Sequence, residues 1–194
     1  MALGDSYTIG ESVSESSRWP VQLADSLNNR GLSIKNPVII ARTGWRTDEL
    51  KKAIEDKKPE KNYDLVGMLI GVNNQYQGKS PESYRPEFEE LLDLAIAHAD
   101  GDKSRVFVVS IPDYGYTPFG KKNQEKISKE LDTYNKINKT LTEARGINYY
   151  YITDISRKYD DALVAEDGLH PSGKQYALWV QEILKDEQFI NSLR

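Results

Sequence analysis

Five apolar runs divide the chain into a regular series of segments. Four of them cover residues 33–41, 64–71, 105–111 and 147–153, and a short apolar stub at residues 1–3 is the fifth. They are rich in β-branched and other apolar residues and do not alternate with polar positions. This pattern predicts strands that are buried on both faces, as in a parallel sheet with helices on either side.

Between these runs the spacing of apolar residues changes to that of a helix, which predicts one apolar stripe on each connecting segment. Two stripes are long, one through positions 84, 88, 91, 92, 95, 96 and 99 and one through 127, 131, 134, 137 and 141. Shorter stripes run through residues 19–27, through residues 50–54 after a predicted N-cap at Thr47, and through residues 176–184 after a predicted N-cap at Ser172.

Strand and helix therefore alternate from one end of the chain to the other. This order predicts an α/β fold with a parallel sheet of about five strands, whose carboxyl ends carry the functional residues. No internal repeat or linker-like segment interrupts the pattern, so we expect residues 1–194 to form a single domain.

Composition narrows the possible functions. With 38% hydrophobic residues the chain can form a core, and a formal net charge of −4 with dispersed basic residues argues against nucleic acid as a partner. The chain has no cysteine and only His98 and His170 as histidines, which excludes thiolate sites and metal sites with several imidazole ligands. Any imidazole chemistry must therefore use one of these two histidines.

The sequence is compatible with two cellular locations. No apolar run approaches the roughly 20 residues of a membrane-spanning helix, and no signal peptide is visible. A cytoplasmic location is the default expectation, yet the first strand is so short that a trimmed, exported protein also fits. The oligomeric state cannot be predicted.

Gly4-Asp5-Ser6 follows the first apolar stub, and we expect Ser6 to lie on a strand-to-helix turn. The next residues, 8–10, predict a loose segment before the first long helix. A turn of this kind exposes a serine hydroxyl beside backbone N–H groups, which suits a nucleophile. Glycine, aspartate and serine are common in loops, so the tripeptide alone is more typical of an ordinary turn.

A possible base lies near the other end of the chain, in Asp167-Gly168-Leu169-His170-Pro171. The proline disfavours helical geometry at His170, so the histidine belongs to a loop before the last helix. A carboxylate three residues earlier can hold one ring N–H and leave the other nitrogen free to accept a proton. His98, at the end of a helical stripe, is expected instead to interact with the helix dipole.

Two other strand ends provide hydrogen-bond donors. Asn73 follows the run at residues 64–71 and offers a side-chain amide, and Gly44 follows the run at residues 33–41 and offers an unshielded backbone N–H. An oxyanion hole needs such donors, although either motif alone also fits a simple turn.

Taken in order, these four motifs resemble the SGNH or GDSL family of serine hydrolases over nearly the whole chain. The resemblance implies a flavodoxin-like three-layer α/β/α sandwich with strand order 2-1-3-4-5. It implies Ser6 as the nucleophile, His170 and Asp167 as the base and its orienting acid, and Ser6 N–H, Gly44 and Asn73 as the oxyanion hole. The family block G-x-N-D reads here with Asn74 in the last position.

The resemblance implies an esterase without a cofactor, acting on a small-molecule or glycan ester. The expected substrate-binding residues are aromatic and lie near the strand ends: Trp45, Tyr76, Tyr114, Tyr116 and Phe119. Gly115 and Gly120 suggest a movable loop over a shallow pocket, which favours short acyl groups. The alternatives are a carbohydrate acetylesterase, a thioesterase or lysophospholipase, an acyltransferase and, less favoured, a non-catalytic binding module.

Overall fold

The computed structural model describes residues 1–158 and 160–193. Within them, a five-stranded sheet has the order β2-β1-β3-β4-β5, and every neighbouring pair is parallel. The predicted fold class and strand order are therefore confirmed. The strands are β1 (Ala2–Gly4), β2 (Ile39–Ala41), β3 (Val66–Leu69), β4 (Val106–Val109) and β5 (Asn148–Tyr150).

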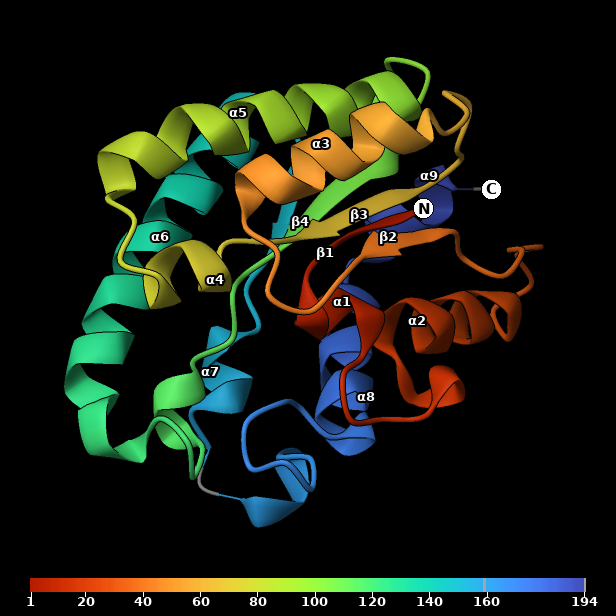
Figure 1. Ribbon diagram of the computed structural model, residues 1–194. Helices are drawn as coiled ribbons and strands as arrows, with labels where there is room; N and C mark the ends of the chain where they lie inside the picture. The colour runs from red at the N-terminus through yellow and green to blue at the C-terminus, as the bar shows by residue number, and fades with distance from the viewer. Residues whose placement is uncertain (159, 194) are drawn as a thin grey trace.

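Helices cover both faces of this sheet (Figure 1). One layer holds α2 (Trp19–Asn28) and α8 (Gly173–Ile183), which pack against each other, and the other holds α3 (Thr47–Lys57), α5 (Pro81–His98) and α6 (Gln124–Ala144). Shorter helices are α1 (Ser6–Ile9), α4 (Val72–Tyr76), α7 (Thr153–Ser156) and α9 (Glu187–Ser192). None of the helices described here combines the length and the apolar character needed to cross a membrane.

Five single turns of 3₁₀-helix complete the chain path. They are η1 (Glu15–Ser17), η2 (Lys103–Arg105), η3 (Tyr114–Tyr116), η4 (Lys121–Asn123) and η5 (Asp161–Leu163) among the described residues. Two of them, η3 and η4, shape the long connection between β4 and α6. That connection contributes aromatic residues to the candidate site.

Aromatic rings fill the core between the sheet and the α2/α8 layer. The Phe107 ring on β4 contacts Trp19 of α2, Tyr150 of β5 and Phe189 of α9 edge to face, with centroid distances of 6.0, 5.7 and 5.7 Å. Such pairs stabilise a core by about 0.5–1.5 kcal/mol each beyond the area they bury. This cluster joins the edge strand β5 and the C-terminal helix to the centre of the sheet.

The strands at the two edges differ from expectation. All residues of β3 and β4 are buried as predicted, but β2 and β5 are only partly buried, because each has a single strand neighbour. The predicted run at 33–41 also shortens to Ile39–Ala41. The Asn28 side chain hydrogen-bonds both the N–H and the C=O of Ile34, and Pro37 has no N–H to donate. Bonding to β1 therefore begins only at Val38, whose carbonyl oxygen accepts from the Ala2 N–H at 2.8 Å.

The helix starts confirm one predicted cap and correct another. Ser172 caps α8 by accepting a hydrogen bond from the Gln175 N–H at 3.2 Å. Thr47 is not the N-cap of α3 but its first residue, and the Glu49 carboxylate accepts from the N–H of the capping Arg46 at 3.0 Å. The Thr47 side chain does not cap the helix and instead hydrogen-bonds Asn74 and Glu87.

Two further expectations need correction. Residues 8–10 were expected to be loose, but residues 6–9 form α1, which ends at Gly10 in the left-handed conformation. His98 is the last residue of α5, as predicted, but it is buried and its ring bonds outside the helix. Its Nδ1 lies 2.7 Å from the carbonyl oxygen of Glu60, so it ties the helix end to the loop before β3.

Candidate active site

The nucleophile motif forms a tight turn at the carboxyl end of the central strand. β1 ends at Gly4, Asp5 caps α1 by accepting from the Tyr7 N–H at 3.0 Å, and Ser6 is the first residue of the helix. The first amides of a helix have no carbonyl partner within it. The Ser6 N–H therefore points out of the helix start, and the Ser6 residue keeps 4% of its surface exposed.

Asp5 is fully buried beside this turn. Burial raises its pKa to about 7, against the opposing effect of the backbone N–H groups that it accepts from. Its Oδ2 has no hydrogen-bond partner among the described residues. Asp5 is therefore a structural carboxyl group that is poised to hold a proton near neutral pH.

Asp167 and His170 form a directly bonded pair in the loop before α8. His170 Nδ1 lies 2.6 Å from Asp167 Oδ2, while Asp167 Oδ1 accepts from the backbone N–H groups of Leu169 and His170 at 2.9 Å each. Burial raises the pKa of Asp167, but hydrogen bonds from Ser12, His170 and these backbone amides outweigh it and hold the pKa well below its ordinary value. Asp167 is ionised at neutral pH.

The pair lies next to the nucleophile turn. The His170 ring contacts the ring of Tyr7, the residue after Ser6, edge to face at a centroid distance of 5.8 Å. Ser6 and His170 make no hydrogen bond with each other in the described structure; catalytic hydrogen bonds often tighten only when substrate binds. The structure thus brings the loop of the Asp167–His170 pair next to α1, the helix that begins with Ser6.

The two predicted oxyanion donors follow β2 and β3, the strands on either side of β1. Asn73, in α4, donates through Nδ2 to the carbonyl oxygen of Trp45 at 3.0 Å, which ties α4 to the loop that contains Gly44. An amide nitrogen has two hydrogens, so one N–H of Asn73 remains. Gly44 has φ +86°, a conformation that favours glycine, and its N–H donates to no described residue.

Three side chains of this edge were not predicted from the sequence. Asn74 is buried and bonds to Thr47, Glu11 accepts from the Thr43 hydroxyl, and Ser12 donates to Asp167 Oδ2 at 2.6 Å. Each contact joins residues that are 27 or more positions apart, and Ser12 lies 155 positions from its partner. No local sequence pattern signals such pairs.

Three of the five aromatic candidates contact one another, and the other two do not belong to this group. The rings of Tyr76, Tyr114 and Phe119 contact one another at centroid distances of 6.2–6.3 Å, and we call these three residues the aromatic cluster. Tyr76 and Phe119 are 59% and 53% exposed, whereas Tyr114 is buried and donates to Gln75 Oε1 at 3.0 Å. Trp45 is half-buried and touches the site through its carbonyl group.

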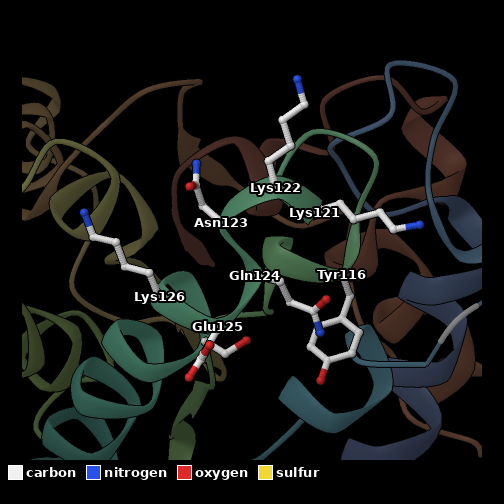
Figure 2. Close-up of a pocket in the computed structure, with 8 residues that line it drawn as sticks. Tyr116, Lys121, Lys122, Asn123, Gln124, Glu125 and Lys126 are labelled. Carbon is white, nitrogen blue, oxygen red and sulfur yellow. The ribbon is translucent and has the colours of Figure 1, made fainter.

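Tyr116 lies apart from the aromatic cluster. Figure 2 shows it beside Gln124 in a hollow of about 680 Å³ at the start of α6, which includes neither Ser6 nor His170 among its lining residues. The side chains of Lys121, Lys122 and Lys126 point in different directions around this hollow and do not converge on a common point. A second hollow of about 930 Å³ lies at the opposite, amino ends of the strands.

The two glycines of the connection from β4 to α6 lie close to neighbouring atoms. A Cβ on Gly120 would lie 2.1 Å from the Tyr114 carbonyl oxygen, and one on Gly115 would lie 2.8 Å from Asp113 Oδ1. Both glycines are therefore points of close packing. Asp113, fully buried, also pairs with Arg157 at 2.9 Å and accepts from Ser128 at 2.6 Å.

The same connection is bonded to the loop of the Asp167–His170 pair. The Phe119 N–H donates to the Gly168 carbonyl oxygen at 3.1 Å. The aromatic cluster thus lies between the helix that carries Asn73 and the loop that carries His170. Among the described residues, no group of three or more histidine, aspartate or glutamate side chains is arranged to hold a metal ion.

The fold and the motif order agree with a family assignment. A family model, that of the GDSL-like Lipase/Acylhydrolase family, matches residues 2–178. The chain belongs to this family, which supports its being a hydrolase. A search of curated proteins found no match.

Solved structures share the fold along the whole chain. A lipase/acylhydrolase from Enterococcus faecalis superposes with a TM-score of 0.74 and 18% identity, over 100% of this chain and 95% of that one. The acetyl xylan esterase AlAXEase superposes with a TM-score of 0.74 and 16% identity, over 96% of this chain and 98% of that one. TesA superposes with a TM-score of 0.72 and 14% identity, over 100% of this chain and 98% of that one. At these identities the likeness concerns the fold alone.

Proposed function

We propose that the protein is a serine esterase that hydrolyses carboxylic esters through an acyl-enzyme intermediate, without a cofactor. The observation that carries this proposal is the 2.6 Å bond between Asp167 and His170, with the His170 ring packed against the residue that follows Ser6. A histidine held at Nδ1 by an ionised carboxylate keeps Nε2 available to accept a proton.

In the proposed reaction, Ser6 Oγ attacks the ester carbonyl carbon while His170 Nε2 takes its proton. Asp167 remains ionised and stabilises the imidazolium, which then protonates the leaving alkoxide as the carbon–oxygen bond to the alcohol breaks. A water molecule next attacks the acyl group, with His170 taking its proton and returning it to Ser6 Oγ. The products are the acid and the alcohol, and the enzyme is regenerated.

The negative oxygen of each tetrahedral intermediate would be stabilised by three donors. They are the Ser6 N–H at the start of α1, the Gly44 N–H and the remaining N–H of the Asn73 amide. The support for this assignment is that all three lie at neighbouring strand ends and that the bond from Asn73 to the Trp45 carbonyl holds two of the loops together. Donors fixed before the reaction need no rearrangement during it.

The test is an activity screen with p-nitrophenyl acetate, butyrate and decanoate on the wild type and on Ser6→Ala. We expect the substitution to lower turnover at least about a thousandfold, because only binding and oxyanion contributions remain. Ser16→Ala, on an exposed serine of the next turn, is the matched control. Full activity of folded Ser6→Ala, or failure of a phosphonate reagent to label Ser6, would refute the proposal.

A preference for short acyl groups is part of the proposal. The sequence leaves little chain for a deep acyl tunnel, and the connection at residues 112–122 is closely packed at Gly115 and Gly120. A methylene that finds no apolar contact gains none of the roughly 0.8 kcal/mol that burial provides. Preference for the decanoate ester would favour a lysophospholipase or thioesterase instead.

The exposed rings of Tyr76 and Phe119 favour a second candidate within the same chemistry, the removal of acetyl groups from a carbohydrate. Sugar rings stack on exposed aromatic faces, and one solved structure with this fold is an acetyl xylan esterase. The rate of acetate release from acetylated xylan oligosaccharides, compared with the rate from p-nitrophenyl acetate, distinguishes a carbohydrate acetylesterase from a general short-chain esterase. Competing alcohols in the same assay detect acyl transfer, and no turnover of any ester would support a binding module.

A further inference from the structure

Ser12 occupies a position that the proposed reaction does not explain. It lies in the exposed segment after α1, where Gly10 N–H and Glu11 N–H both donate to the Ser6 carbonyl oxygen at 3.0 Å. Its backbone has φ +64°, in the left-handed region that non-glycine residues rarely adopt. Strained positions of this kind are maintained only where surrounding contacts fix them, and they are often found at functional sites.

The side chain of Ser12 shares an acceptor atom with the histidine. Asp167 Oδ2 receives both the Ser12 hydroxyl and His170 Nδ1, each at 2.6 Å, while Oδ1 receives two backbone amides of its own loop. Of these four donors, only Ser12 comes from outside residues 167–170. The carboxylate therefore has one distant anchor, which comes from the segment directly after the nucleophile helix.

That segment is also attached to the oxyanion side of the site. The Glu11 carboxylate accepts a hydrogen bond from the hydroxyl of Thr43, the residue before Gly44. Residues 10–12 are thus bonded to the nucleophile helix, to the loop of Gly44 and to Asp167 in turn. This explains how an exposed serine can hold a fixed and strained backbone conformation.

We infer that Ser12 is a positioning residue, whose hydroxyl orients the Asp167 carboxylate and thereby fixes the ring of His170 toward Ser6. The inference rests on the proposed function. Ser12 does not touch the reacting atoms; it acts only through Asp167. Its hydrogen bond is also the largest of the effects that lower the pKa of Asp167 against burial, which keeps the carboxylate ionised beside the histidine.

The first test compares Ser12→Ala, Ser12→Gly and Ser16→Ala in p-nitrophenyl acetate hydrolysis. Both Ser12 variants should lower kcat about 5- to 20-fold and change KM less than about twofold, because a hydrogen bond to a charged group is lost while substrate contacts remain. Glycine removes the backbone strain and alanine keeps it, so equal losses assign the effect to the hydroxyl. Wild-type kcat in both variants would overturn the inference.

A double-mutant cycle tests whether Ser12 acts through Asp167. Ser12→Ala should have no further effect, within about twofold, in an Asp167→Ala background, because the group it positions is then missing. The same fold loss in both backgrounds would mean that Ser12 acts elsewhere and would overturn the inference. Thermal unfolding of each variant shows that the comparison concerns folded protein.

A third measurement does not depend on turnover. The proton on His170 Nδ1, observed at low field by NMR in the full chain, should move in Ser12→Ala and keep its position in Ser16→Ala. An unchanged signal would overturn the inference even if esterase activity is present. If the signal moves but the protein hydrolyses no ester, the positioning role of Ser12 is supported and the proposed function is refuted.

Discussion

Asn74 and Thr47 are joined by two hydrogen bonds in opposite directions. The Thr47 N–H donates to Asn74 Oδ1 at 3.1 Å, and Asn74 Nδ2 donates to Thr47 Oγ1 at 2.7 Å. The Thr47 hydroxyl in turn donates to the Glu87 carboxylate, which lies 3.5 Å from the same Asn74 nitrogen. This buried group connects the start of α3, the helix with Asn73, and α5.

These bonds explain why asparagine stands where the family block G-x-N-D has aspartate. Glu87 already supplies a carboxylate, and Asn74 supplies the amide hydrogens that an aspartate lacks. We expect Asn74→Asp to lower the free energy of unfolding by about 1–3 kcal/mol, because two carboxylates would then compete for one hydroxyl. Urea unfolding measures this change.

Glu87→Gln is the matched second substitution in that experiment. In the Asn74→Asp background it should restore part of the lost stability, since it returns an amide to the group. If Asn74→Asp is as stable as the wild type at pH 7, the account of the family departure is wrong.

Substitutions of Asn73 and Asn74 should have clearly different effects on kcat. Asn73→Ala should lower kcat about 10²–10³-fold, or 2.7–4 kcal/mol in the transition state, with KM nearly unchanged, because a single oxyanion donor is lost. Asn74→Ala should affect kcat far less and stability more. Steady-state kinetics on p-nitrophenyl acetate decides the matter, and a reversed order of the two kcat effects would shift the oxyanion assignment by one residue.

Asp5 should make stability depend on pH. Its pKa is about 7 in the folded protein against an ordinary 3.8, so the folded state binds the proton more tightly. Its contribution is fully present below about pH 4 and is lost as the pH rises toward 7, by up to about 4 kcal/mol. Asp5→Asn should therefore gain stability relative to the wild type over that interval.

Urea unfolding at pH 4.5, 6 and 7.5 measures this difference, with Asp25→Asn on an exposed carboxylate as the control. The comparison between variant and wild type cancels the other carboxylates, such as Asp167, whose low pKa has the opposite effect on stability. A difference that is constant across the three pH values would show that Asp5 titrates normally.

The exposed members of the aromatic cluster should govern the alcohol or acyl side of the substrate. Tyr76→Ala and Phe119→Ala should raise KM for the preferred ester about 3- to 20-fold, with a smaller change in kcat, since stacking area is lost and the proton-transfer groups remain. Tyr116→Ala, outside the cluster, is the control. Equal effects of all three substitutions would argue against a binding role for the cluster.

The alternating sequence pattern predicted a parallel α/β sheet of about five strands, because the spacing of buried residues is dictated by strand and helix geometry; the strand order came from the family resemblance. It also predicted the Asp167–His170 pair and the Ser172 cap, since these contacts lie within three residues in sequence. The length of β2 was wrong because the Asn28 side chain takes the main-chain groups of Ile34, a tertiary contact. Ser12 was missed for the same reason: its partner is remote.

The backbone hydrogen bond from Phe119 to Gly168 has a consequence for engineering of substrate range. A substrate bulky enough to displace the Phe119 main chain should also shift the peptide two residues before His170 and thereby slow proton transfer, whereas truncation of the Phe119 side chain leaves this hydrogen bond in place. The side chain of Tyr76, in α4, makes no hydrogen bond with any described residue and contacts the Phe119 ring. Directed evolution for broader specificity should therefore accumulate its tolerated changes at position 76 rather than at 119.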